Sequence, residues 1–146
     1  MRNTRYWVVL LLIIISLQIS SCTSKGTGVE KIQPFQLEPV DGSDFKKIIL
    51  TEKAAERLDI QTAPVRNQVV NGSQRKVIPY AAVMYDLAGG TFVYKNPEPL
   101  VFIRQIIVID YIEGDLAVLV EGPEVDTAVV IVGAAELYGA EVGVSK

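Results

Sequence analysis

Hydrophobic residues in the second half of the chain occur in short runs, rich in β-branched side chains, that are separated by turn residues. Asn71-Gly72 is a strong hairpin signal, and Glu113-Gly114-Asp115 marks a second turn. Runs at a spacing of roughly ten residues are typical of antiparallel β-sandwiches and β-barrels. We therefore predict strands within residues 60–65, 76–85, 91–94, 101–109, 116–120 and 127–132.

One segment of the chain carries a helical pattern instead. Thr51 is a suitable N-cap, and Glu52 favours the first helical turn. A short apolar stripe is formed by Ala54, Ala55 and Leu58. The predicted fold class is mainly β, a small antiparallel β-barrel or sandwich of about six strands with one short α-helix.

The amino-terminal pattern is of a different kind. Arg2 and Arg5 precede an apolar stretch over residues 7–19, and Ser20-Ser21 then precede Cys22. A charged segment, an apolar segment and small residues, in this order, are typical of a secretory signal peptide. The apolar stretch is shorter than the roughly 20 residues that a membrane-spanning helix needs. This length disfavours an ordinary transmembrane anchor.

Cys22 is the only cysteine in the chain, and it stands directly after the small residues. Its position resembles the first mature residue of bacterial lipoproteins, which implies a diacylglyceryl group on the Cys22 thiol. An ordinary secreted protein with a cysteine near the cleavage point is the alternative. The lipoprotein interpretation predicts a protein that is lipid-anchored to a cell membrane on its extracytoplasmic side, either periplasmic or at the cell surface.

The leader also defines the expected domains. We expect a signal peptide over residues 1–21, a flexible tether over residues 22–45 and one β-domain over residues 46–146. The tether segment contains Pro34, Pro39 and several glycines and shows no hydrophobic period.

Composition excludes several functional classes. The leader carries two of the 14 basic residues and none of the 17 acidic ones, so the rest of the chain is acidic. An acidic chain without a basic run does not favour nucleic acid as a partner. The chain contains no histidine, which removes the usual base for a serine nucleophile and any cysteine–histidine metal site. We expect no enzymatic activity, no catalytic residue, no metal and no cofactor.

Two groups of residues remain as candidate sites. Asp110, Glu113 and Asp115 cluster near a predicted turn, where solvated carboxylates are favoured over catalysis or calcium binding. Leu137 and Tyr138 stand between glycines near the end of the chain. They form either a contact surface for a partner protein or a tail that packs back over the β-domain.

Aromatic residues recur along the predicted strands. On one exposed face they would suit a carbohydrate or apolar ligand, but at this spacing core packing is favoured. The residues concerned are Tyr80, Tyr85, Phe92, Tyr94, Phe102, Tyr111 and Tyr138.

Several segments, taken in order, resemble the membrane-proximal end of membrane-fusion (periplasmic adaptor) proteins, the adaptors of efflux transporters of the RND and ABC types. Residues 77–83 read Val-Ile-Pro-Tyr-Ala-Ala-Val, and residues 91–94 read Thr-Phe-Val-Tyr. In the family, a valine-proline-small-small-valine strand likewise precedes an aromatic-valine strand. The resemblance covers residues 48–142 and includes the segments 50–65, 102–108, 119–123 and 128–134.

The resemblance implies a β-module rather than a complete adaptor. Family members place a β-barrel, a lipoyl-like domain and an α-helical hairpin between regions that only residues 66–75 separate here. The implied function is a non-catalytic accessory module of a transporter complex, with a transporter's extracytoplasmic domain as its partner. A free-standing lipoprotein that binds a small ligand or a cell-wall component is the alternative.

The lipid on Cys22 can be tested in cells. Inhibition of lipoprotein signal peptidase with globomycin is expected to produce a larger form of the protein, because the leader is retained. Cys22→Ala is expected to abolish incorporation of a labelled fatty acid. Electrophoretic mobility and label incorporation are the measurements, and a wild-type protein that is neither labelled nor shifted contradicts the lipoprotein interpretation.

Overall fold

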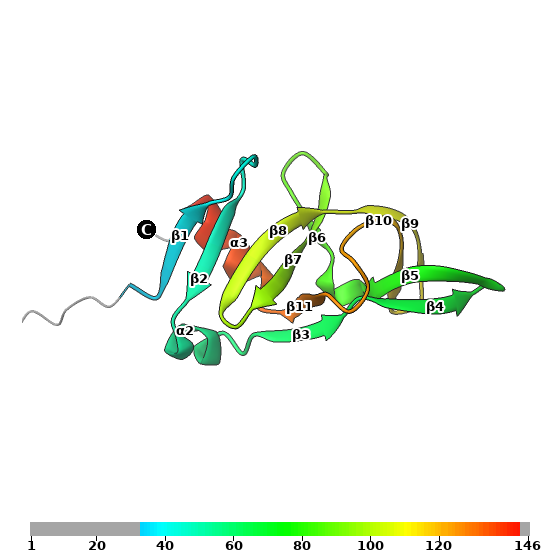
Figure 1. Ribbon diagram of the computed structural model, residues 1–146, viewed down its shortest axis with the longest axis horizontal. Helices are drawn as coiled ribbons and strands as arrows, with labels where there is room; N and C mark the ends of the chain where they lie inside the picture. Colours follow the sequence, from blue (N-terminus) through cyan, green and yellow to red (C-terminus); the bar gives the residue numbers. More distant parts are fainter. Residues whose placement is uncertain (1–32, 144–146) are drawn as a thin grey trace, which may run out of the picture. The chain divides into compact units, whose positions relative to one another are not determined.

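The computed structural model describes residues 33–143, so the leader, Cys22 and the first part of the predicted tether lie outside the described residues. The described chain forms two antiparallel sheets and two α-helices, which confirms the mainly β fold class (Figure 1). The larger sheet contains β1 (Phe35–Pro39), β2 (Lys46–Leu50), β3 (Gln61–Pro64), β6 (Met84–Tyr85), β7 (Thr91–Glu98), β8 (Val101–Ile106) and β11 (Ala128–Val132). The smaller sheet contains β4 (Arg66–Val70), β5 (Ser73–Pro79), β9 (Val108–Glu113) and β10 (Leu116–Glu121).

The strands of the larger sheet follow the order β1-β2-β8-β7-β11-β3, with β6 paired to β7, and those of the smaller sheet the order β4-β5-β10-β9. The predicted turn at Asn71-Gly72 joins β4 to β5, and both residues have the positive φ that such hairpins require. The turn at Glu113-Gly114-Asp115 joins β9 to β10, as predicted.

The chain crosses from one sheet to the other at two positions, and each lies inside a segment that the sequence predicts as a single strand. Residues 101–109 divide at the buried Ile107, whose N–H donates to Thr91 O while Thr91 Oγ1 donates to Ile107 O. Residues 76–85 divide at Pro79, after which the 3₁₀ helix η1 (Tyr80–Ala82) begins. The hydrophobic run continues through Ile107, so no local pattern marks that break, whereas Pro79 is a residue that favours an edge or an end of a strand.

The predicted tether is wrong over its last part, because residues 35–39 form β1. This strand pairs with β2 in the register Phe35↔Leu50 to Pro39↔Lys46. Phe35 and Leu37 point to the core, whereas Gln36 and Glu38 are exposed. This alternation is the period-2 signal of a half-buried strand. The β-domain therefore begins about ten residues earlier than the predicted boundary at 46.

The predicted short helix is confirmed as α2 (Glu52–Arg57), with the Thr51 side chain accepting from the Ala54 N–H. A second helix, α3 (Ala134–Val142), was not predicted and forms the end of the chain, for which the sequence left open a contact surface or a tail that packs back over the β-domain. It lies against one face of the larger sheet (Figure 1). Six of its nine residues are alanine, leucine or glutamate, which are strong helix formers, so helix propensity was a local signal for α3 although a side-chain cap is lacking.

The core has two main parts. One lies between α3 and the larger sheet and includes Ile48, Phe92, Tyr94, Phe102 and Leu137. The other includes Val65, Ile78, Val93, Ile107 and Leu119 and joins residues of both sheets. Three of the aromatic residues are thus buried, as predicted, but the core prediction is wrong for Tyr80 and Tyr85, which are exposed.

Gly133 supplies a conformation and a space that no other residue provides at the start of α3. Its φ is +87°, and a Cβ there would overlap Ile60 Cδ1. Gly133→Ala is expected to lower the free energy of unfolding by about 2–4 kcal/mol. Gly139→Ala is the matched control, because a Cβ at this helical position meets no atom within 4 Å, and it is expected to add up to about 1 kcal/mol. Urea unfolding measures both, and equal stabilities of the two variants would contradict this assignment.

Candidate binding groove

An apolar groove of about 450 Å³ lies between β1, α2 and α3. Two lining residues carry charged side chains, and the rest are apolar or glycine. The lining residues are Pro34, Phe35, Leu50, Ala54, Arg57, Leu58, Glu136, Leu137, Gly139 and Ala140. The groove therefore combines hydrocarbon walls with very few polar groups.

Small residues keep the groove open where the two helices face it. α2 contributes Ala54, and α3 contributes Gly139 and Ala140. A Cβ at Gly139 would meet no atom within 4 Å, so space remains beside the helix. Leu50 and Leu137, both buried, form the floor. The groove is thus a consequence of short side chains on α2 and α3 above a packed sheet.

The charged side chains of the groove belong to different helices. Arg57 lies in the last turn of α2 and Glu136 in the first turn of α3, and both residues are exposed. Neither takes part in any of the ion pairs found within residues 33–143. One positive and one negative group are therefore available to a ligand.

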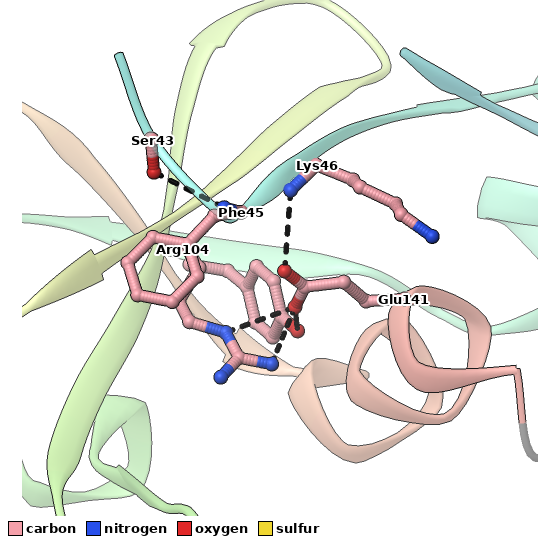
Figure 2. A network of polar contacts seen from close by, with 6 residues as sticks. Ser43, Phe45, Lys46, Arg104 and Glu141 are labelled. Carbon is pink, nitrogen blue, oxygen red and sulfur yellow. Dashed lines mark hydrogen bonds and ion pairs between the residues drawn. The ribbon is translucent and has the colours of Figure 1, made fainter. Parts of the chain in front are cut away.

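A buried ion pair holds α3 on the larger sheet (Figure 2). The Glu141 carboxylate accepts hydrogen bonds from Arg104 Nε at 2.9 Å and Arg104 Nη2 at 2.7 Å. The Tyr94 hydroxyl also donates to this carboxylate, and the Lys46 N–H donates to it at 3.4 Å. The side chains of Arg104 and Glu141 are only 10% and 6% exposed. Four donors thus compensate the buried negative charge.

Aromatic rings enclose the Arg104 guanidinium. Its central carbon lies 4.4 Å from the ring centre of Phe92, 4.9 Å from that of Tyr138 and 5.0 Å from that of Phe45. A cation over aromatic faces is attracted by the ring quadrupole, most strongly where water is excluded. The cation is therefore stabilised by the rings as well as by the carboxylate.

The pKa shifts in this cluster follow from burial and pairing. Burial, and then the hydrogen bond to Glu141, raise the pKa of Tyr94 above its ordinary value. Burial lowers the pKa of Arg104, but the hydrogen bond and charge of Glu141 outweigh it, so the net shift is upward. Tyr94 therefore stays a donor and Arg104 stays charged at neutral pH. The cluster is suited to positioning α3 rather than to transferring a proton.

Of the two alternatives for Leu137 and Tyr138, a contact surface or a tail that packs back over the β-domain, the structure rules out the contact surface for Leu137. Leu137 is 0% exposed and belongs to the core beneath α3, so it is not available as an interface anchor. Tyr138 is half-buried, with its ring 5.5 Å from that of Phe92. The tail packs back over the sheet because its helical period places Ala134, Leu137 and Glu141 on one face. Leu137 contributes to the groove only as part of its floor.

The acidic cluster at the second turn is not a candidate site. Asp110 pairs with Arg75 at 2.5 Å, and Glu113 and Asp115 are exposed. Within residues 33–143, no group of three or more acidic, cysteine or histidine side chains is arranged to hold a metal ion. None of the helices in this described part of the chain has the length and apolar character needed to cross a membrane.

Comparisons with known proteins add no relative. No protein-family model matches the chain, and neither the curated proteins nor the solved structures contain a significant match.

The buried pair makes a prediction for stability. Glu141→Leu leaves the Arg104 charge buried without its partner and is expected to destabilise the fold by about 3 kcal/mol or more. Combining it with Arg104→Met removes both charges and is expected to recover a large part of the loss. Asp110→Leu, at the exposed pair with Arg75, is the control and is expected to cost far less. Chemical unfolding measures all variants, and a double variant as unstable as Glu141→Leu would contradict the pairing argument.

Proposed function

We propose that the protein is a lipid-anchored, non-catalytic binding module on the extracytoplasmic side of a membrane, and that the groove between α2 and α3 is its binding site. The observation that carries the proposal is the groove itself, which is apolar, preformed and, within residues 33–143, bordered by two charged side chains. Its volume of about 450 Å³ falls in the range of about 300–1,000 Å³ that is typical of small-molecule sites.

The chemistry of the groove supports binding rather than reaction. Among the described residues, the ionisable side chains of its lining are Arg57 and Glu136, both exposed, and the lining includes no serine, threonine, cysteine or lysine. The buried carboxylate of Glu141 already accepts hydrogen bonds from the Tyr94 hydroxyl and the Arg104 guanidinium. Within residues 33–143, the groove lining therefore does not place a nucleophile next to a base, which is the usual arrangement for covalent catalysis.

The proposed setting is a transporter complex in the cell envelope. The resemblance of residues 48–142 to the membrane-proximal end of membrane-fusion proteins supports this setting, and the lipoprotein-like leader supports attachment by Cys22. In this role the lipid and the tether keep the β-domain beside a transporter's extracytoplasmic domain. The mechanism is positional and uses no cofactor.

A free-standing ligand-binding lipoprotein is the second candidate. The observation that favours it is the apolar interior of the groove, which suits a small hydrophobic molecule without any protein partner. The two candidates differ in whether another protein accompanies the chain in the membrane.

Mild crosslinking in intact cells separates the two candidates. The full chain is purified from its own membranes, and a transporter subunit is expected among the crosslinked proteins, identified by mass spectrometry. Cys22→Ala, which removes the anchor, is expected to reduce that recovery strongly because the domain is no longer held at the membrane. Recovery of the chain with lipids but without a protein partner would refute the transporter setting in favour of the free-standing lipoprotein.

A further inference from the structure

We propose that the groove holds one acyl chain of a zwitterionic phospholipid, with the lipid phosphate at Arg57 and its ammonium group at Glu136. This inference rests on the proposed function, because it takes the groove as the binding site and places the domain at a membrane. It adds the chemical class of the ligand and assigns a role to each charged side chain of the groove.

The interior of the groove selects hydrocarbon. Leu50 and Leu137 form the floor, Phe35 and Leu58 contribute apolar side chains, and Ala140 leaves space beside α3. A polar ligand would lose its hydration there without gaining hydrogen-bond partners, which is unfavourable. An acyl chain exchanges apolar surface only, so its transfer into the groove is favoured.

The groove's charges select the headgroup. An arginine guanidinium binds phosphate oxygens through two parallel hydrogen bonds. Arg57 is exposed, and it belongs to none of the ion pairs found within residues 33–143. Glu136 supplies the opposite charge from α3. A phosphoethanolamine group carries an anion and a cation and so complements both side chains. A purely anionic lipid or a free fatty acid would satisfy Arg57 but leave Glu136 facing a like charge.

The course of the chain keeps this groove within reach of a bilayer. Pro34 lines the groove, and Cys22 lies twelve residues upstream. Fully extended, that segment spans at most about 40 Å. A domain anchored at Cys22 can therefore reach the bilayer surface, where one acyl chain could enter the groove while the second chain remains in the bilayer.

Photolabelling of the full chain in vesicles tests the proposal. The membrane-anchored protein is reconstituted with phosphatidylethanolamine and phosphatidylglycerol, and part of the phosphatidylethanolamine carries a diazirine near the end of one acyl chain. After irradiation, mass spectrometry is expected to find adducts on peptides from residues 50–58 and 134–140. An absence of adducts in both segments would overturn the proposal.

Two matched pairs of variants locate the label. Ala140→Phe fills the groove and is expected to lower labelling by about ten-fold or more, whereas Ala135→Phe, on the exposed side of the same helix, leaves it unchanged. Arg57→Glu is expected to lower labelling by about ten-fold, and Lys53→Glu, also exposed on α2, is its control. Labelling that survives Ala140→Phe, or that falls equally with Arg57→Glu and Lys53→Glu, would overturn the assignment.

Additional variants and lipids distinguish this phospholipid from a different occupant of the groove. Circular dichroism checks that the Ala140→Phe variant is folded. If it is not folded, Gly139→Leu is used in its place, because a Cβ at Gly139 meets no atom within 4 Å. Equal labelling by diazirine-bearing phosphatidylglycerol would overturn the zwitterionic headgroup. Labelling that appears only in Cys22→Ala would also overturn the proposal, since the chain's own lipid would then be the occupant. If the lipid experiments fail while a transporter subunit still crosslinks, the proposed function stands without this ligand.

Discussion

The buried ion pair between Arg104 and Glu141 determines where the last helix of the protein lies. Arg104 comes from β8 in the larger sheet and Glu141 from α3, so the pair fastens the helix to the sheet. Taking two charges out of water is expensive, and the attraction between them compensates only if the remaining hydrogen-bonding positions are also satisfied. The Tyr94 hydroxyl and the Lys46 N–H donate further hydrogen bonds to the Glu141 carboxylate, and three aromatic rings surround the Arg104 guanidinium. Because both buried charges are fully partnered only when α3 lies at this place on the sheet, the pair favours one position of the helix.

The groove depends on that fixed position. Leu137 packs into the core at the middle of α3, and Glu141 anchors the helix one turn later. These two contacts hold α3 on the sheet, and Ala54, Gly139 and Ala140 leave space between α3 and α2. A packed interior normally closes such voids, because uncovered apolar surface and lost dispersion contacts are unfavourable. The protein thus retains an apolar surface that its own side chains leave uncovered.

Ion pairs elsewhere in the domain differ from this one in their environment. Lys47 with Glu38 and Arg75 with Asp110 are close pairs, but their side chains remain substantially exposed. In water such pairs contribute little, because screening and side-chain entropy offset the attraction. The short distance between two charges is therefore a poor guide to their importance in this fold. Burial together with complete hydrogen bonding distinguishes Arg104 and Glu141.

The sequence by itself determined the mainly β class, the Asn71-Gly72 hairpin and the helix capped by Thr51, because local hydrophobic period and turn chemistry specify such elements. It also contains the lipoprotein-like leader over residues 1–21 and the Cys22 that follows it, and both lie outside the described residues. Only the tertiary structure decided that β1 joins the sheet, that the strand predicted over residues 101–109 divides at Ile107, and that Leu137 faces inward. The reason is the distance along the chain: Arg104 and Glu141 are 37 residues apart, and the groove combines residues from 34 to 140. No local pattern records which of these segments meet, since that choice is made by packing and charge pairing in the folded core.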